Sequence, residues 1–309
     1  MFEAGKTLAP VVLFAYARPE HTRLTLDALA ANKLASHSDL VIYADAACRE
    51  SDEDKVREVR EIIHAASGFR SIKIVERETN FGLAKNIVDG VSEVCDKNGR
   101  VIVLEDDIVT APNFLSFMNA ALERYENEPR VWHISGWNYP IDPEGLGEAF
   151  LWRVMNCWGW ATWSNRWRHF SKDPARLIDT WRSEEIARFN LDGAHDFLAQ
   201  VMANRNGALN TWAIFWYASI FENHGLCLNP ARSFVCNIGN DGSGVNCGLT
   251  EDFSTKQLGA CVENFPEVIE ESALAVQRVK IFYGGMRRTF MQRLARYVKS
   301  LAPVMAGHR

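Results

Sequence analysis

The sequence has no CxxC pair, and its seven cysteines are widely spaced and odd in number. These absences exclude the common cysteine-based metal and redox motifs, and they fit a reducing compartment better than a disulfide framework. A long hydrophobic run is also missing near the N-terminus, where the first apolar stretch is soon followed by Arg18 and Glu20. We therefore expect neither a signal peptide nor a membrane span there, and we expect a cytoplasmic protein.

An excess of positive charge is missing as well. The formal net charge is -5 over 309 residues, of which 24% are charged and 47% hydrophobic. This composition is typical of a soluble globular protein. The sign of the charge argues against general nucleic-acid binding, because phosphate backbones select for clustered Lys and Arg. Any anion that this protein binds must therefore bind at a confined site and not over a broad basic surface.

The first third of the chain alternates between two hydrophobic periodicities. Apolar runs of strand length occupy residues 9–16, 39–45, 69–78 and 100–104, and amphipathic stretches of helix length occupy residues 19–33, 51–67 and 81–97. A β-α series of this kind predicts an α/β fold with a mostly parallel central sheet flanked by helices. In such sheets ligands bind at the carboxyl ends of the strands, where the strand order reverses.

Polar residues follow three of these predicted strands: Arg18 after the first, Asp45 after the second, and Glu105, Asp106 and Asp107 after the fourth. No GxGxxG follows the first strand and no GxxxxGK[ST] occurs anywhere, which excludes both glycine-rich phosphate motifs. A nucleotide bound here would need another partner for its phosphates. Mn²⁺ or Mg²⁺, held by one or two carboxylates and by phosphate oxygens, is the obvious one.

A purely structural interpretation of the three acids is also open. In that interpretation they belong to a solvated loop, and Asp107 or Thr110 caps a helix that begins near Pro112.

The second half of the chain is rich in tryptophan, since all ten tryptophans lie between Trp132 and Trp216. Some of them must pack the core. Mixed with Arg, Asn and His, they also suit an aromatic-lined site that stacks on sugar rings. Because no linker or repeat is evident, we expect residues 131–271 to extend the domain that residues 1–130 begin.

Residues 272–309 carry eight Arg or Lys and no acidic residue, interleaved with apolar side chains. This pattern is typical of a basic amphipathic helix, which can lie on an anionic membrane surface. That interpretation predicts a peripheral protein at the inner face of a membrane. The alternative is a helix that packs on the domain by its apolar side.

Several segments, taken in order, resemble glycosyltransferases of the GT-A fold, and most closely the N-acetylglucosaminyltransferase I family. The segments are VVLFAYAR (11–18), VIYAD (41–45), VIVLEDDIVTAPNFLSFM (101–118), VWHISGWN (131–138) and CWGWATW (157–163). In that family an apolar strand runs into a Glu-Asp-Asp (DXD-like) motif and an aromatic helix follows. The resemblance implies a Rossmann-like GT-A domain whose residues 1–130 bind a nucleotide sugar and whose Trp-rich residues 131–271 bind the acceptor.

The resemblance also implies roles for individual residues. Asp107 would bind the metal directly, and Glu105 and Asp106 would contact the ribose or sugar of the donor. Arg18 and Asp45 would hold the nucleobase, which in a UDP-sugar is uracil. The full set of residues implied in donor binding is Ala15, Tyr16, Arg18, Asp45, Asn80, Lys85, Asn86, Glu105, Asp106 and Asp107.

Three residues of this donor-binding set share a further feature. Asn80, Lys85 and Asn86 stand at a predicted helix start, which suits an anion, although a turn with a surface lysine explains them equally well. On the acceptor side, the residues implied in sugar binding are Trp137, Asn138, Trp158, Gly159 and Trp160.

The general base of the family is missing. An inverting transferase needs a carboxylate beside the acceptor hydroxyl, and the family supplies it in a Trp-Asp-Asp-Trp segment. Here Trp212 is followed by Ala213, Ile214 and Phe215. A retaining mechanism, which needs no such base, stays open.

Other residues could replace that carboxylate. Asp241 is the first candidate, because the glycine-rich segment NIGNDGSGVNCG (237–248) resembles a family loop that closes over the donor. Asp196 is the second, and the weaker candidates are Glu222, His195 and His224. In the same segment Asn246 stands where the family often has histidine.

The sequence thus predicts a metal-dependent, inverting glycosyltransferase. It would move a sugar, such as N-acetylglucosamine or another hexose, from a UDP-sugar to a hydroxyl of a glycan, a lipid-linked sugar or a protein. One alternative is a catalytically inactive carbohydrate-binding module of the same fold. A sugar-phosphate nucleotidyltransferase is a weaker one, because AYARPEHT (15–22) lacks the glycine-rich loop that such an enzyme needs after its first strand.

Overall fold

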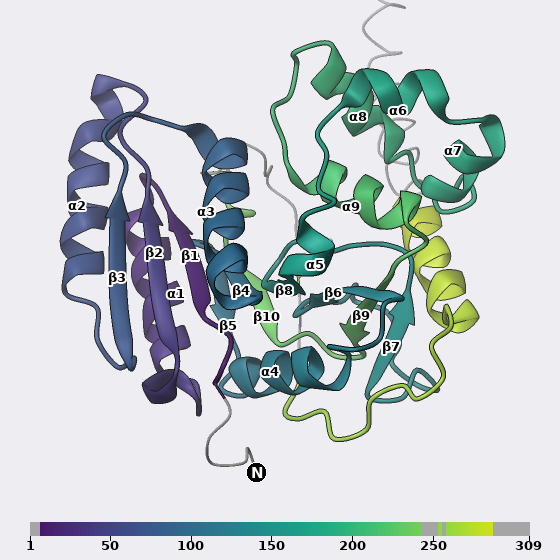
Figure 1. The fold of residues 1–309 in the computed structure, drawn as a ribbon, viewed down its shortest axis with the longest axis horizontal. Coiled ribbons are helices and arrows are strands. Elements are labelled where there is room, and N and C mark those ends of the chain that lie inside the picture. The colour runs from purple at the N-terminus through teal and green to yellow at the C-terminus, as the bar shows by residue number, and fades with distance from the viewer. Residues whose placement is uncertain (1–6, 243–252, 255–257, 287–309) are drawn as a thin grey trace, which may run out of the picture.

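The computed structural model describes residues 7–242, 253–254 and 258–286 (Figure 1). The strands are β1 (Val11–Ala15), β2 (Asp39–Ala44), β3 (Ser71–Glu76), β4 (Arg100–Glu105), β5 (Ile108–Thr110), β6 (Val131–Ser135), β7 (Ala149–Trp152), β8 (Trp160–Trp163), β9 (Leu226–Pro230) and β10 (Val235–Asn237). The α-helices are α1 (Pro19–Ala30), α2 (Glu53–His64), α3 (Gly82–Asn98), α4 (Phe114–Arg124), α5 (Ser164–Trp167), α6 (Pro174–Thr180), α7 (Ser183–Phe189), α8 (Leu198–Arg205) and α9 (Ala213–Glu222). Two short 3₁₀ helices, η1 (Ala35–His37) and η2 (Glu50–Asp52), complete the elements with assigned bounds, and residues 273–286 are also helical.

Within the described residues, eight strands form one sheet in the order β3-β2-β1-β4-β8-β6-β9-β7. The four strands β3, β2, β1 and β4 are parallel, as their apolar sequences predict, and β8 then pairs antiparallel to β4. Buried on both faces, β1 has the continuous apolar sequence that parallel strands require. The prediction of an α/β fold with a large, mostly parallel central sheet flanked by helices is confirmed.

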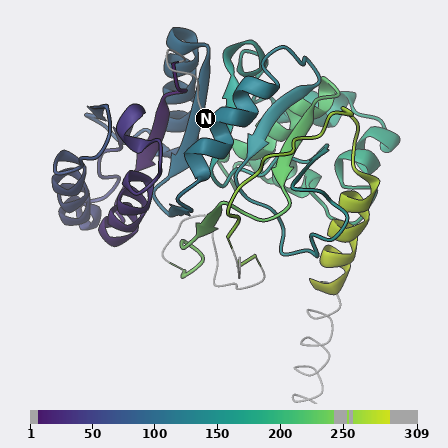
Figure 2. The ribbon, with the colours of Figure 1, turned by 90° about the horizontal axis from the view of Figure 1, so that it is seen from below.

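Helices cover both faces of the parallel half. Helices α1 and α2 lie together on one face, and α3 covers the other face over β1 and β4 (Figures 1 and 2). This arrangement follows from the chain path: β1, β2 and β3 step in one direction, and α3 then carries the chain back across β1 to β4. The strand order therefore reverses between β1 and β4.

The strand register aligns the carboxyl ends of the strands at this reversal. Phe14 of β1 pairs with Glu105 of β4, and Ala15 pairs with Ala44 of β2. The next residues along the chain are the Tyr16 loop, Asp45 and Asp106, so the side chains predicted at strand ends do meet at one edge of the sheet.

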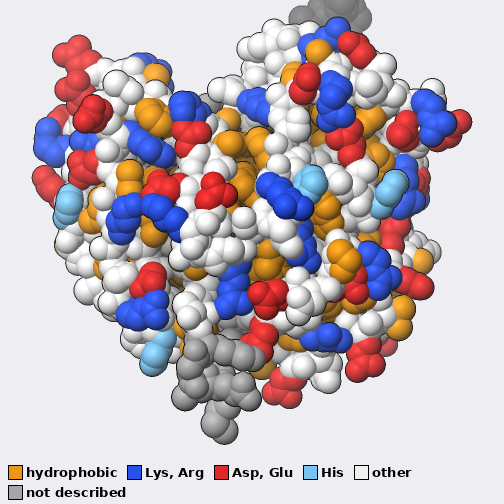
Figure 3. All heavy atoms as spheres, viewed as in Figure 1, with side chains coloured by type: hydrophobic (Ala, Val, Ile, Leu, Met, Phe, Trp, Pro, Cys, Tyr) orange, Lys and Arg blue, Asp and Glu red, His pale blue; other side chains and the backbone are white. Residues whose placement is uncertain are grey.

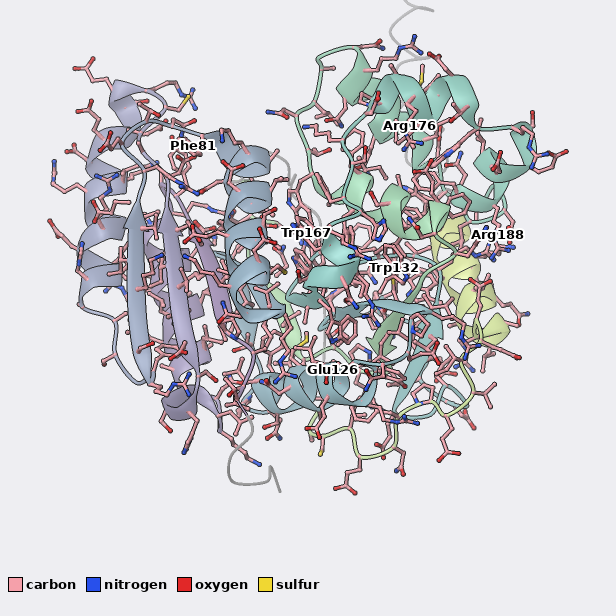
Figure 4. The ribbon with its side chains drawn as sticks, viewed as in Figure 1. Phe81, Glu126, Trp132, Trp167, Arg176 and Arg188 are labelled. Atoms are coloured by element: carbon pink, nitrogen blue, oxygen red, sulfur yellow. The ribbon has the colours of Figure 1, made fainter. Side chains whose placement is uncertain are left out.

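Strands from the second half of the chain continue the same sheet, and tryptophans fill the space beside it. Trp152, Trp160 and Trp216 are fully buried. Trp132 and Trp167 both lie near Trp216, with ring centroids 6.1 and 4.9 Å from it, in the centre of the molecule (Figure 4). Most of the tryptophan content is therefore core.

The described part of the C-terminal segment packs on the domain. Along the helix 273–286, Ala275, Val279 and Tyr283 are buried, and the Tyr283 hydroxyl lies 2.7 Å from that of Tyr139. Its apolar side is thus covered by protein, as the alternative to membrane binding expects. The remainder of the predicted tail, residues 287–309, lies outside the described residues. Among the helices that are described, none has the length and apolar character needed to cross a bilayer.

Candidate donor and acceptor sites

The three acids lie where β4 ends, and Asp106 is the most firmly held of them. Its Oδ2 accepts a hydrogen bond from the Tyr16 backbone N–H at 3.1 Å, and its carbonyl accepts one from the Thr25 hydroxyl at 2.8 Å. Its Oδ1 accepts from the Arg18 guanidinium. With 3% of its surface exposed, Asp106 ties the loop after β1 to the end of β4.

Among the described residues, Asp107 has a single charged partner, which is also Arg18. Nη1 of Arg18 lies 3.0 Å from Asp107 Oδ2, and Nη2 contacts Asp106. Burial by itself would lower the pKa of Arg18, but the two carboxylates raise it above the ordinary value. One guanidinium therefore serves two acids, and in this structure Arg18 contacts carboxylates in the position where the resemblance implies a nucleobase contact.

Glu105 is the acid without a partner. Within the described residues no hydrogen bond or ion pair reaches its carboxylate. Burial, followed by the negative charges of Asp107 and Asp106, raises the pKa of Glu105 to about 8. Near neutral pH Glu105 is therefore largely protonated, and the excess negative charge of the cluster comes from Asp106 and Asp107, which share the single positive charge of Arg18.

This arrangement fits a divalent cation only if a substrate supplies further ligands. In the described residues, no group of three or more His, Cys, Asp or Glu side chains is arranged to hold a metal by itself. Mg²⁺ and Mn²⁺ in transferases need only one or two carboxylates, because phosphate oxygens and water supply the rest. Asp107, beside the unpaired Glu105, satisfies that requirement.

The loop after β10 lies against Asp107. β10 pairs antiparallel with β5, and the Ile238 N–H donates to the Asp107 carbonyl at 2.9 Å. A side chain at Gly239 would collide with the Asp107 carboxylate and stand 2.8 Å from Arg18 Nη1. Two residues further on, Asp241 Oδ2 lies 3.2 Å from His21 Nε2 of α1.

The structure contradicts the helix-capping role in the purely structural interpretation of the acids. A strand follows Asp107 directly, and the next helix, α4, begins at Phe114 after Asn113, with no side-chain cap. The prediction that Asp107 or Thr110 caps that helix is therefore wrong.

Asp45, directly after β2, accepts hydrogen bonds from the start of α3 and so connects these two elements. Its Oδ1 accepts from the Phe81 N–H at 2.8 Å, and its Oδ2 accepts from the Gly82 N–H at 2.9 Å and from the Asn80 amide at 3.3 Å. The N-terminus of α3, at the upper end of that helix where Figure 4 labels Phe81, thus already has a carboxylate partner. The Asp45 N–H donates to the Ala15 carbonyl, which places Asp45 next to the loop after β1.

Lys85 and Asn86 do not join the acids. The Lys85 ammonium contacts Asp89 one turn along α3 and lies 4.3 Å from the centre of the Phe81 ring. Asn86 is buried and accepts from Arg77 Nε at 3.0 Å. Both residues have local partners on and beside α3.

A pocket of about 250 Å³ is lined mainly by residues from the second half of the chain. Separately from this pocket, Figure 3 shows a notch in the molecular surface between the part built on β1 to β3 and the part built on α6 to α8, with hydrophobic side chains visible in it. Residues of the pocket include two of the predicted sugar-binding tryptophans, and all of them are uncharged. They are Trp137, Tyr139, Met155, Asn156, Cys157, Trp158, Phe197, Gln200, Ala213, Ile214, Tyr217 and Phe253.

Two buried donors belong to this pocket wall. Trp137 Nε1–H and Asn156 Nδ2–H₂ have no hydrogen-bond partner in the described part of the chain. Trp137 meets Trp158 edge to face, with ring centroids 4.7 Å apart. Aromatic faces together with unpaired N–H groups suit a ligand that carries oxygen atoms on an apolar frame.

The other predicted sugar contacts lie behind this wall. Trp160 is completely buried and stacks on Trp212 at 5.1 Å, so in this structure it is a core residue. Asn138 is buried and donates to the Ala231 carbonyl at 3.2 Å. Gly159 lies against β5, where an added Cβ would stand 3.4 Å from Ile108 Cγ2, next to Asp107. Trp158 of the pocket wall is thus followed directly by a residue that packs against Ile108, the neighbour of Asp107 in the sequence.

The two candidate bases have different surroundings. Asp241 belongs to the loop that contacts Asp107, whereas Asp196 lies before α8, where it accepts from the Ala199 N–H and the Asn190 amide, both at 3.1 Å. Where the family has its Asp-Asp pair, Ala213 and Ile214 line the pocket. Asp196 therefore has the contacts of a helix cap.

The weaker candidates also have structural partners. Glu222 binds Arg176 through two hydrogen bonds of 2.8 and 2.7 Å, and His195 stacks on Tyr283 with ring centroids 4.2 Å apart. His224 follows α9 with a positive φ of 53°. Asn246 lies outside the described residues.

Comparisons with known proteins give similarity of structure only. No protein-family model matches the chain, and no curated protein sequence matches it. Among solved structures it is similar to a mannosyltransferase, PcManGT from Pyrobaculum calidifontis in complex with GDP-mannose and Mn²⁺, at 12% identity and a TM-score of 0.38, over 72% of this chain and 70% of that one. It is also similar to an active-site mutant of LgtC, at 10% identity and a TM-score of 0.37, over 69% of this chain and 70% of that one.

Neither protein is named as an N-acetylglucosaminyltransferase, so that closer family resemblance stays a prediction from the sequence. At such low similarity, the proposal of function rests on this chain's own residues and their geometry.

Proposed function

We propose that this protein is a nucleotide-sugar glycosyltransferase of the GT-A type. The observation that carries the proposal is the position of Glu105, Asp106 and Asp107 at the reversal of strand order, with the loop of Gly239 against Asp107. Ligands of α/β sheets bind at that point. Acids, rather than a glycine-rich loop, line it here, so a divalent cation is the natural partner for the diphosphate of the donor.

The residue that would hold the cation is Asp107. Glu105, whose pKa is raised to about 8, would contribute a second carboxylate only if the cation displaced its proton. When bound with the donor, the cation supplies neutralisation of the charge that develops on the leaving diphosphate. Asp106 has a different role, because its bonds to Tyr16 and Thr25 fix the strand end so that Asp107 is held in place. The donor base, which we propose to be uracil, would lie between the loop after β1 and Asp45.

The acceptor would bind in the aromatic pocket. Its walls are uncharged, and Trp137 and Asn156 offer donors to hydroxyl or carbonyl oxygens of a carbohydrate. The packing of Gly159 against Ile108, the residue after Asp107, supports a position of this wall near the donor site. A sugar held in the pocket is thereby presented to the donor side of the sheet, and positioning of this kind contributes strongly to catalysis.

We assign the general base of an inverting reaction to Asp241. It shares a loop with Gly239, and among the carboxylates put forward it is the one whose loop contacts Asp107. His21, 3.2 Å away, would accept or share the proton that Asp241 removes from the acceptor hydroxyl.

A thermal-shift screen tests the proposal. Nucleotide sugars and nucleoside diphosphates are added with and without Mn²⁺, and ligands that bind the native state raise its melting temperature by mass action. We expect stabilisation by UDP and a UDP-sugar that requires Mn²⁺. The absence of a shift with any nucleotide, with or without the metal, would contradict the proposal.

One observation favours a second candidate, a carbohydrate-binding module without activity. In the part of the chain that the structure describes, no carboxylate lines the aromatic pocket, and Ala213 and Ile214 occupy the base position of the family that the sequence resembles. Release of free nucleoside diphosphate from a donor mixture separates the two candidates. A transferase releases it, and faster with acceptor, whereas a binding module retains sugar affinity and releases none.

A further inference from the structure

Arg18 and a divalent cation require the same carboxylate. In the structure, Arg18 Nη1 lies 3.0 Å from Asp107 Oδ2 with little exposure, since 19% of the Arg18 side chain and 6% of the Asp107 side chain reach solvent. The backbone at Gly239 packs closely against both Asp107 and Arg18. On the side that faces Gly239, no space therefore remains for an additional ion between them. Two cations held at one carboxylate would also repel each other strongly in so buried a site.

The two acids that bind Arg18 differ in how many other partners they have. Besides Arg18, Asp106 has two further partners, because its carboxylate accepts a hydrogen bond from the Tyr16 N–H and its carbonyl accepts one from the Thr25 hydroxyl. Asp107 has Arg18 as its only side-chain partner among the described residues. A small movement of the guanidinium, still anchored on Asp106, would free Asp107.

We propose that Arg18 is a positioning residue that occupies Asp107 until a nucleoside diphosphate binds, so that cation and nucleotide bind cooperatively. The diphosphate offers the guanidinium a new anionic partner, and Asp107 is then released to the cation. The inference rests on the proposed function, because the diphosphate of the donor is what draws Arg18 away.

Reciprocity gives the inference a measurable form. If UDP strengthens Mn²⁺ binding by some factor, Mn²⁺ must strengthen UDP binding by the same factor. Removing Arg18 removes the competitor at Asp107, so Mn²⁺ alone should bind more tightly and the coupling factor should shrink. A merely structural role for Arg18 predicts no gain in affinity for Mn²⁺ alone.

The experiment measures free Mn²⁺ by electron paramagnetic resonance during titration of the full chain. The variants are Arg18→Gln and, as the matched control, Arg23→Gln, which removes the same charge from the exposed side of α1. We expect Arg18→Gln to bind Mn²⁺ alone about tenfold more tightly than wild type, and Arg23→Gln to be unchanged. A double variant, Arg18→Gln with Asp107→Asn, should lose the gain.

The conservative variant Arg18→Lys keeps the inference testable if Arg18→Gln does not fold. It keeps a positive charge beside Asp106 but not the fork that reaches both acids, so its Mn²⁺ affinity should lie between wild type and Arg18→Gln. Equal Mn²⁺ affinity in wild type, Arg18→Lys and Arg18→Gln would overturn the inference even if UDP binds with Mn²⁺. Tighter Mn²⁺ binding in Arg18→Gln without any binding of UDP would support the competition at Asp107 and instead contradict the proposed function.

Discussion

At the scale of single residues, Gly239 has a role that its sequence context does not reveal. The loop backbone contacts both Asp107 and Arg18, and a methyl group there would collide with the Asp107 carboxylate. Gly239→Ala should therefore displace the proposed metal ligand while the fold persists. We expect Mn²⁺-dependent UDP affinity to fall at least about tenfold. This loss corresponds to about 1.4 kcal/mol of binding free energy.

Gly284→Ala is the matched control, since among the described residues no atom outside its own helix backbone and chain neighbours lies within 4 Å of a Cβ added there. Both variants are compared by thermal melting and by UDP titration with Mn²⁺. Equal UDP affinity in Gly239→Ala and Gly284→Ala would contradict the assignment of Asp107 to the donor site.

Asp45 is a second residue whose contacts predict a measurable effect. Its buried carboxylate accepts from two backbone N–H groups at the start of α3, and Asp45→Ala leaves both unpaired. The free energy of unfolding should fall by about 2 kcal/mol. Urea denaturation measures it, and Asp89→Ala, which removes an exposed partner of Lys85, should change it by less than about 0.5 kcal/mol.

At the scale of elements, β6 contains a buried histidine that makes stability depend on pH. His133 is fully buried between two strands and α9; its Nε2 faces the Asn156 carbonyl at 3.0 Å and its Nδ1 faces Trp216 Nε1–H at 3.2 Å. These partners require a neutral ring with the proton on Nε2. Burial lowers the pKa of His133 from 6.5 to about 3.

The sign of this pH dependence follows from the difference in proton binding between the folded and the unfolded chain. Between pH 6.5 and 3 the unfolded chain binds a proton at this position and the folded chain does not, so the contribution of His133 is complete above pH 6.5 and is lost as the pH falls. The loss should approach 1.4 kcal/mol per pH unit. Chemical denaturation at pH 7 and pH 5 measures it, and His133→Gln should be less stable at pH 7 but show a flatter profile. An equal pH dependence in the variant would contradict this assignment.

The elements also show what the sequence could predict. The parallel strands were predictable because β1 and β4 are continuous apolar runs between helical patterns, and the carboxyl ends of such strands must share an edge. The pairing of β5 with β10 was not predictable. Each is three residues long, and their contact joins Ile108 to Asn237, far apart in the chain. The sequence therefore placed the acids correctly but gave no sign that Gly239 contacts Asp107.

The same limit applies to Arg18 and to the tryptophans. The partners of Arg18 and Asp107 depend on side-chain geometry, which no spacing in the sequence encodes. Trp160 and Trp137 are only a few elements apart and equally aromatic, yet Trp160 is a core residue and Trp137 lines the pocket.

At the scale of the whole molecule, the helix 273–286 packs against a residue of the aromatic pocket. The Tyr283 hydroxyl pairs with that of Tyr139, which lines the aromatic pocket. Tyr283→Phe should lower stability by about 1 kcal/mol and the melting temperature by about 2–4 °C. Ile281→Ala, at a position 66% exposed on the same helix, serves as the control and should melt like wild type. Identical melting of Tyr283→Phe and wild type would show that this contact does not stabilise the fold.

The most direct test of the central claim is a calorimetric titration of wild type and Asp107→Asn with UDP in the presence and absence of Mn²⁺. Asp107→Asn keeps the size of the side chain and removes the charge that would bind the cation. The account predicts binding of UDP to wild type that depends on Mn²⁺, and loss of that dependence in Asp107→Asn, with both proteins equally folded. Equal, Mn²⁺-dependent binding of UDP to both proteins would contradict the account.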